Sequence, residues 1–233
     1  MGDLKQGHLF VISGPSGTGK GAICAGLIAG TKMMLSVSMT TRPPREHEEE
    51  GKSYYFTDKA CFREAVAEGG FFEYAEVYGE YYGTPKAPVL AQLEKGNDVI
   101  LEIEMQGAAQ VKQSMPDAVL VFILPPSQEE LRKRIEGRGA DTPERIALRL
   151  GQAEGEIEQL ERYDYSVVND DLGGAIRDVH AIIRAERLMG AGRGAKFMSP
   201  EDMAAIRRAG RLRVGQGARK IIESYQAGNI KKQ

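Results

Sequence analysis

The chain has 233 residues, of which 42% are hydrophobic and 27% are charged, and its formal net charge is -2. This composition fits a globular chain with one sizeable core and gives no overall sign of a nucleic-acid-binding or membrane protein. Only Cys24 and Cys61 are present, without C-x-x-C or histidine spacing for a metal. Disulfides and zinc are therefore disfavoured and a reducing cytoplasm is favoured. The first apolar run, residues 9–13, is too short for a signal peptide or a membrane span.

Charge is distributed unevenly along the chain. From Leu188 onward there are ten basic and three acidic residues, a balance of +7, so the preceding residues carry -9. Such a shift in charge is typical of a boundary between parts of a chain. We therefore predict a domain over residues 1–188 and a basic C-terminal extension over residues 189–233, with the core closed before the extension begins.

Strand and helix patterns alternate through the predicted domain. Near-continuous apolar runs predict strands at residues 9–13, 99–103, 118–124 and 166–168. Helical patterns predict helices at residues 106–114, 127–136 and 172–188, the second beginning with a capping box of Ser127 and Glu130. Apolar runs of this kind suit strands that are covered on both faces. The order predicts an α/β fold, a parallel sheet with helices on both faces.

Two segments depart from this pattern. Residues 35–92 hold most of the tyrosines together with four prolines, which predicts an inserted lobe over about residues 37–95. Residues 138–149 are short, charged and punctuated by glycine, which predicts a mobile lid.

A glycine-rich loop follows the first predicted strand. The candidate ATP-binding residues of this loop are Gly14, Pro15, Ser16, Gly17, Thr18, Gly19, Lys20 and Gly21. Glycines let successive N–H groups converge on phosphate oxygens at a helix N-terminus, and the Lys20 ammonium group would reach the β- and γ-phosphates. The spacing alone also occurs in ordinary strand-to-helix turns, but its place after an apolar strand favours the nucleotide site.

Gly21 occupies the position where a Ser or Thr hydroxyl normally holds Mg²⁺. The metal that accompanies ATP must then be held by phosphate oxygens, water and an acid elsewhere. Glu102, at the end of the second predicted strand, is the candidate, and its alternative role is that of an acid at a sheet edge.

The segment Ser36 to Arg45, which reads SVSMTTRPPR, resembles the guanylate kinase family, whose GMP-binding lobe begins in this way. Further matches follow in the same order. They lie at residues 51–56, 72–75, 79–84, 101–107, 123–127, 134–139, 168–171 and 185–186. The resemblance spans about residues 7–188. It implies the fold of a P-loop nucleoside monophosphate kinase and transfer of the γ-phosphoryl group of ATP, with Mg²⁺, to GMP and dGMP, giving ADP and GDP.

The resemblance also implies which residues bind GMP. Its phosphate would be held by Arg42, Arg45, Tyr54 and Tyr82, and an arginine fork suits a dianionic monophosphate. Its guanine would be held by Glu73, Glu104, Ser38 and Thr84. Guanine donates from N1 and from its 2-amino group and so needs acceptors, whereas adenine would leave these acceptors unpaired. Relatives usually have aspartate at the positions of Glu102 and Glu104, so the detailed geometry there can differ.

The resemblance places three arginines on the lid side, Arg134, Arg138 and Arg149, where they would neutralise charge on the transferring phosphoryl group. A solvated helix face is the alternative for Arg134. Asn169 would contact the adenine, and its alternative is a turn cap.

A different class of function is an inactive guanylate-kinase-like module that binds protein. Such modules lack a working phosphate loop, whereas this chain retains Lys20 and the glycines. For residues 189–233 we favour a partly disordered, solvated extension. The alternatives are a contact within a homo-oligomer or a weak electrostatic contact with RNA.

Overall fold

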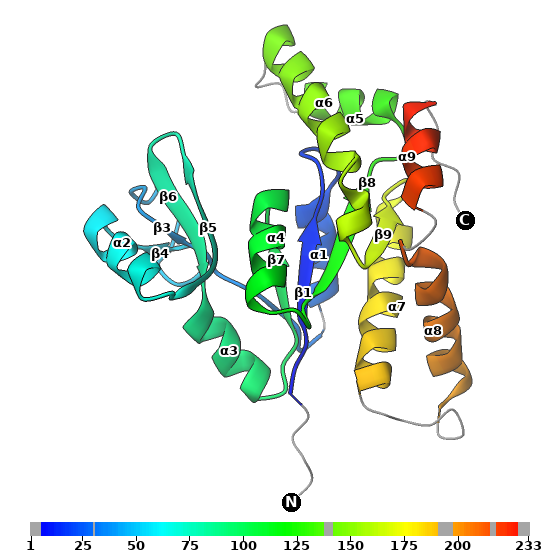
Figure 1. The fold of residues 1–233 in the computed structure, drawn as a ribbon, viewed down its shortest axis with the longest axis horizontal. Coiled ribbons are helices and arrows are strands. Elements are labelled where there is room, and N and C mark those ends of the chain that lie inside the picture. Colours follow the sequence, from blue (N-terminus) through cyan, green and yellow to red (C-terminus); the bar gives the residue numbers. More distant parts are fainter. Residues whose placement is uncertain (1–5, 30, 138–141, 191–197, 215–217, 228–233) are drawn as a thin grey trace, which may run out of the picture. The chain divides into compact units, whose positions relative to one another are not determined.

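The computed structural model describes residues 6–29, 31–137, 142–190, 198–214 and 218–227 (Figure 1). The chain forms two compact units. Unit 1 contains residues 1–11 and 32–118, and unit 2 contains residues 12–31 and 119–233. No helix in the described ranges is long and apolar enough to cross a membrane.

A five-stranded sheet has the strand order β2-β7-β1-β8-β9. Its strands are β1 (Leu9–Ser13), β2 (Met34–Leu35), β7 (Val99–Glu102), β8 (Val119–Leu124) and β9 (Tyr165–Val168). β2 pairs in parallel with β7, and β8 pairs in parallel with β9. Strands β1 and β8 are buried along their whole length, as their continuous apolar sequences predict. The predicted α/β fold is confirmed, and only the two-residue β2 was absent from the prediction.

Unit 1 has a second sheet with the order β4-β3-β6-β5. Its strands are β3 (Met39–Thr40), β4 (Tyr55–Phe56), β5 (Phe71–Val77) and β6 (Glu80–Pro85). The helices of this unit are α2 (Lys59–Ala67), α3 (Lys86–Glu94) and α4 (Met105–Ser114). Phe62 of α2 is fully buried and stacks on Phe71, with ring centroids 4.5 Å apart. The tyrosine-rich segment therefore has a sheet and an aromatic core of its own.

Unit 2 contains α1 (Lys20–Ile28), α5 (Gln128–Glu136), α6 (Pro143–Ile157), the short 3₁₀ helix η1 (Leu160–Arg162) and α7 (Leu172–Gly190). Ser127 caps α5 as predicted, accepting a hydrogen bond from the Glu130 N–H at 3.1 Å. The Glu130 carboxylate does not complete the predicted capping box. It accepts instead from Arg134 Nε, one turn further along the helix, at 2.9 Å.

Helices α8 (Pro200–Leu212) and α9 (Ala218–Gln226) form the C-terminal part of unit 2. Ser199 and Asp202 make a full capping box at the start of α8. Ala205 and Ala209, one turn apart, are buried as α8 packs on α7, and Arg208 Nε pairs with Asp178 of α7. The predicted solvated extension is therefore wrong for the described part of the tail, and the core is not closed at residue 188.

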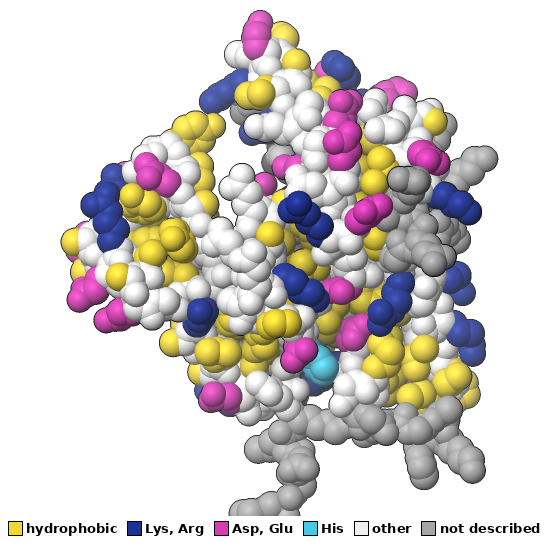
Figure 2. All heavy atoms as spheres, viewed as in Figure 1, with side chains coloured by type: hydrophobic (Ala, Val, Ile, Leu, Met, Phe, Trp, Pro, Cys, Tyr) yellow, Lys and Arg dark blue, Asp and Glu magenta, His cyan; other side chains and the backbone are white. Residues whose placement is uncertain are grey.

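The basic balance of the tail has a structural explanation. Figure 2 shows Lys and Arg side chains over α8. Arg207 and Arg211 of this helix are exposed. On the inner side, charges are paired with α7: Arg184 Nη2 lies 2.7 Å from Asp202 Oδ1, and Arg213 Nη2 lies 3.1 Å from Glu186 Oε1. A count of charges in sequence cannot separate these two faces.

The pair between Arg208 and Asp178 predicts a measurable contribution to stability. Asp178 is only 9% exposed, so Arg208→Ala leaves a poorly solvated carboxylate without its partner. We expect the free energy of unfolding, from urea denaturation, to fall by about 1–3 kcal/mol. The matched control is Arg207→Ala, which removes an exposed arginine of the same helix and should cost less than about 0.5 kcal/mol. Equal stability of the two variants would contradict a stabilising pair.

Candidate functional site

The glycine-rich loop between β1 and α1 adopts a backbone that only glycine tolerates well. Gly14, Gly17 and Gly19 have φ angles of +136°, +91° and +88°. A Cβ atom on Gly14 would lie 2.4 Å from the Ile123 carbonyl oxygen, and one on Gly19 would lie 2.6 Å from Asn169 Nδ2. The spacing of the glycines is therefore required both by conformation and by close packing.

Lys20 is the first residue of α1, and its side chain folds back over the loop. Its Nζ donates to the carbonyl oxygens of Gly14, at 2.5 Å, and Pro15, at 3.2 Å. Gly19 precedes the helix without a side-chain cap. The first N–H groups of a helix have no acceptor within it, so the start of α1 offers an ammonium group and backbone donors at one place. This arrangement suits a polyphosphate.

Asn169 and Ser13 flank the loop. Asn169 is 6% exposed and its Nδ2 donates to the Thr18 carbonyl oxygen at 2.8 Å, so its amide supports the loop, while its predicted adenine contact stays a prediction. Ser13 is fully buried and its hydroxyl has no hydrogen-bond partner among the described residues. Our sequence reasoning missed Ser13, although a polar residue that ends an apolar strand before the loop was a usable signal.

Arg134 and Arg149, which were predicted to lie on the lid side, belong to the same unit as the loop. A Cβ atom on Gly17 would lie 3.1 Å from Ile135 Cγ1 and 3.2 Å from Leu131 Cδ1, so α5 packs against the loop. Arg134 of α5 is 26% exposed and pairs with Glu130. Arg149 lies on α6 and is partly exposed. Arg138 lies outside the described residues.

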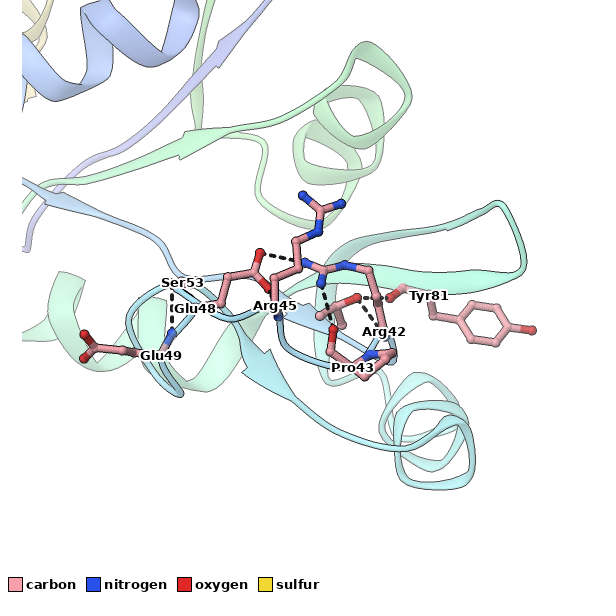
Figure 3. Close-up of polar contacts among 8 residues, drawn as sticks. Arg42, Pro43, Arg45, Glu48, Glu49, Ser53 and Tyr81 are labelled. Carbon is pink, nitrogen blue, oxygen red and sulfur yellow. Dashed lines mark hydrogen bonds and ion pairs between the residues drawn. The ribbon is translucent and has the colours of Figure 1, made fainter. Parts of the chain in front are cut away.

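In unit 1, Arg42 is held by several contacts (Figure 3). Its guanidinium donates to Glu48 Oε1 at 2.8 Å and to the Pro43 carbonyl oxygen at 2.7 Å, and it lies 5.5 Å from the centre of the Tyr54 ring. The hydrogen bond to Glu48 is the main cause that raises the pKa of Arg42, and the same bond lowers the pKa of Glu48. Glu48 was missed by sequence reasoning because no local pattern links it to Arg42.

Arg45 lies beside Arg42 but is oriented differently. Its backbone N–H donates to Glu48 Oε2 at 2.8 Å, whereas its guanidinium extends away from Glu48 in Figure 3. Within the described ranges, no hydrogen bond or ion pair engages that guanidinium, which is exposed. The Tyr54 and Tyr82 rings meet edge to face 6.1 Å apart, so the predicted phosphate-binding tyrosines lie together next to Arg42.

Glu73 and Thr84 face each other on β5 and β6. The Thr84 hydroxyl donates to Glu73 Oε1 at 2.6 Å. Burial raises the pKa of Glu73, although the bonds from Thr84 oppose the shift. A Cβ atom on Gly107 would lie 2.8 Å from Glu73 Oε2, so a glycine in α4 makes room for this carboxylate. Ser38, just before β3, is partly exposed.

Glu102 and Glu104 are exposed side chains at the end of β7 and the N-cap of α4. In the parts of the chain that the structure describes, no three His, Cys, Asp or Glu side chains gather to hold a metal. One or two carboxylates together with phosphate oxygens and water are the usual donor set for Mg²⁺ bound with a nucleotide. The residues present fit that kind of binding and do not form a metal cage made of protein alone.

The predicted residues thus fall into two groups. The phosphate loop, Asn169, Arg134 and Arg149 belong to unit 2, and the residues predicted to bind GMP or metal belong to unit 1.

Comparisons with known proteins identify the family of the chain. The guanylate kinase family model matches residues 6–186. The guanylate kinase of Clostridium acetobutylicum is 51% identical over 183 residues, covering 78% of this chain and 88% of the relative. The enzyme of Thermus thermophilus is 53% identical over 182 residues, covering 78% and 83%. A solved guanylate kinase from Anaplasma phagocytophilum aligns with a TM-score of 0.63 at 36% identity, covering 79% and 88%. The chain belongs to the guanylate kinase family.

Proposed function

We propose that unit 2 of this chain binds ATP and unit 1 binds GMP in the reaction ATP + GMP → ADP + GDP, the activity of its family. One observation carries the proposal: the Lys20 ammonium group, at the start of α1, folds back onto a loop that contains three glycines with positive φ angles. The loop and α1 hold the triphosphate of ATP, and the residues of unit 1 hold GMP.

On the ATP side, Lys20 exchanges its contacts with the carbonyl oxygens of Gly14 and Pro15 for contacts with the β- and γ-phosphates. The bound Mg²⁺ supplies charge neutralisation at the phosphate oxygens, and Glu102 would hold it through water. Asn169 keeps the loop in place through Thr18, so the N–H groups need no rearrangement when the phosphates arrive.

On the GMP side, Arg45 supplies the open guanidinium fork and Arg42 supplies one that is already oriented. Glu48 and Pro43 hold Arg42 in position, which lowers the ordering cost when GMP binds. A bidentate arginine matches the geometry of a phosphate dianion. The Tyr54 and Tyr82 hydroxyls add donors to the same phosphate.

Guanine is selected by Glu73, with Glu104, Ser38 and Thr84 completing the base site. The ionised Glu73 carboxylate accepts from the N1–H and 2-amino groups of guanine, while Thr84 fixes its orientation. Adenine has an acceptor at N1, so it would leave this half-buried carboxylate without its donors.

Transfer itself needs no general base, because the attacking oxygen belongs to an ionised phosphate. The γ-phosphoryl group develops charge on its oxygens, which Lys20, Arg134, Arg138 and Arg149 neutralise. Excluding water from the site prevents transfer to water in place of GMP. An inactive binding module has no use for an intact phosphate loop, so the loop favours catalysis. Two cysteines outside any disulfide support a cytoplasmic location.

Lys20→Met tests the phosphate loop. We expect kcat to fall by roughly 10³-fold or more, because charge neutralisation at the transferred group is lost. Thermal unfolding should change little, since the hydrogen bonds that Lys20 makes within the described part of the chain stay in its own loop. The control Lys32→Met removes an exposed lysine and should leave kcat unchanged. Near wild-type turnover in Lys20→Met would refute the role of this loop.

Glu73→Gln tests base selection. The amide presents one acceptor and one donor, so kcat/KM for GMP should fall by an amount equivalent to about 2–4 kcal/mol, with a much smaller loss for AMP. The control Glu76→Gln lies on the same strand with an exposed side chain.

Because the pKa of Glu73 is raised, its ionised form is lost as pH falls. KM for GMP should therefore rise at a higher pH than it would with a glutamate of ordinary pKa. Equal losses of kcat/KM for GMP and AMP in Glu73→Gln would show that Glu73 supports the structure and does not select the base.

Glu102→Gln tests the metal side. With Gly21 in place of a hydroxyl, we expect the Mg²⁺ concentration for half-maximal rate to rise, and calorimetry should show weaker binding of Mg²⁺–ATP, while ATP alone binds as before. Glu94→Gln, an exposed acid of α3, is the matched control. If the Mg²⁺ titration of Glu102→Gln overlays that of the wild type, Glu102 has no part in holding the metal.

A further inference from the structure

Helix α9 lies outside residues 6–186, the part of the chain that matches the family, yet it packs against a functional part of unit 2. Tyr225 of α9 is 1% exposed. α9 contacts η1, the segment that directly follows α6, and Figure 1 shows α9, in red, next to α5 and the C-terminal part of α6.

Side chains of α9 and of the end of α6 face one hollow. Ile222 and Tyr225 of α9 line a hollow of about 260 Å³ together with Glu154, Ile157 and Glu158 from the end of α6. Ile157 and Leu160 are buried there as well. Burial and the nearby Glu154 carboxylate raise the pKa of Tyr225 to about 12, which agrees with a phenol packed close to the end of α6.

Helices α5 and α6 form a pair with a small core of its own. Leu131 and Ile135 pack with Ala153, and Gln128 Nε2 donates to Glu154 Oε1 at 3.1 Å. This core is small, and a helix of this length has little stability without packing. α9 meets the pair at the end where Gln128 and Glu154 join.

The same two helices carry lid-side arginines, Arg134 in the last turn of α5 and Arg149 in the middle of α6. Arg149 lies about two turns before Ile157, so a shift of the C-terminal end of α6 is transmitted to it along a rigid helix. Misplacing a charged group by about 1 Å can cost up to roughly 100-fold in rate.

We propose that α9 is a positioning element for phosphoryl transfer, in which Tyr225 fixes the C-terminal end of α6 and thereby the placement of Arg149 and Arg134. This inference rests on the proposed role of the two arginines. Tyr225 touches no reacting group and acts only through α6.

The test compares Tyr225→Ala with Tyr225→Phe in the full chain. Tyr225→Ala should lower kcat by roughly 10- to 100-fold and raise KM for ATP, while KM for GMP changes less than about twofold because the GMP residues belong to the other unit. Tyr225→Phe keeps the packed ring and should restore both constants. Amide hydrogen exchange of Pro143–Ile157 should rise about 10-fold or more in Tyr225→Ala, with α1 unchanged.

Three outcomes would overturn the proposal. The first is wild-type kcat and KM for ATP in Tyr225→Ala, and the second is a loss of kcat without faster exchange in α6. If Tyr225→Ala does not fold, Ile222→Ala, which removes less buried surface, is measured in the same way. The third outcome is then a folded Ile222→Ala variant with wild-type kcat.

Arg149→Ala, assayed in parallel, distinguishes a failure of the positioning role of Tyr225 from a failure of the proposed role of Arg149. If it loses turnover while Tyr225→Ala does not, the positioning role alone fails. If Arg149→Ala keeps wild-type turnover, the proposed role of that arginine fails and the inference fails with it.

Discussion

The packing of the glycine loop against its neighbours is the constraint on which the ATP side depends. The loop must turn its N–H groups inward, and it does so with left-handed residues that leave no space for a side chain against Ile123 or Asn169. The ends of β8 and β9 and the face of α5 therefore meet at one loop. The alternation of strands and helices in unit 2 brings these elements together at a short backbone segment, which we propose as the anion site.

Charge is arranged differently on the GMP side. Glu48 binds the Arg42 guanidinium, the Arg45 side chain is exposed, and burial raises the pKa of Glu73. Burying the charge of a carboxylate is costly by itself, even where Thr84 donates hydrogen bonds to it. In the proposed function a guanine would supply donors to this carboxylate and an adenine would not, so we propose that selectivity is obtained at some expense of stability in the free protein.

Local patterns allowed part of this structure to be predicted. The strands β1, β7, β8 and β9, the loop from Gly14 and the Ser127 cap follow from apolar runs and capping chemistry, which are properties of neighbouring residues. The Glu48 contact, the Arg134 partner that displaces the capping box, and the packing of Ala205 and Tyr225 depend on which surfaces meet in three dimensions. The expectation of a solvated tail was wrong because the net charge does not show which side chains of the tail are paired with α7 and which are exposed.

The central claim is that the two groups of residues serve transfer from ATP to GMP in particular. The most direct measurement is the initial rate of ADP formation by the wild-type chain with GMP, dGMP, AMP, UMP and dTMP as acceptors under one set of conditions. The account predicts turnover with GMP and dGMP, and a kcat/KM for AMP lower by roughly 10³-fold or more. Comparable kcat/KM values for GMP and AMP would contradict it.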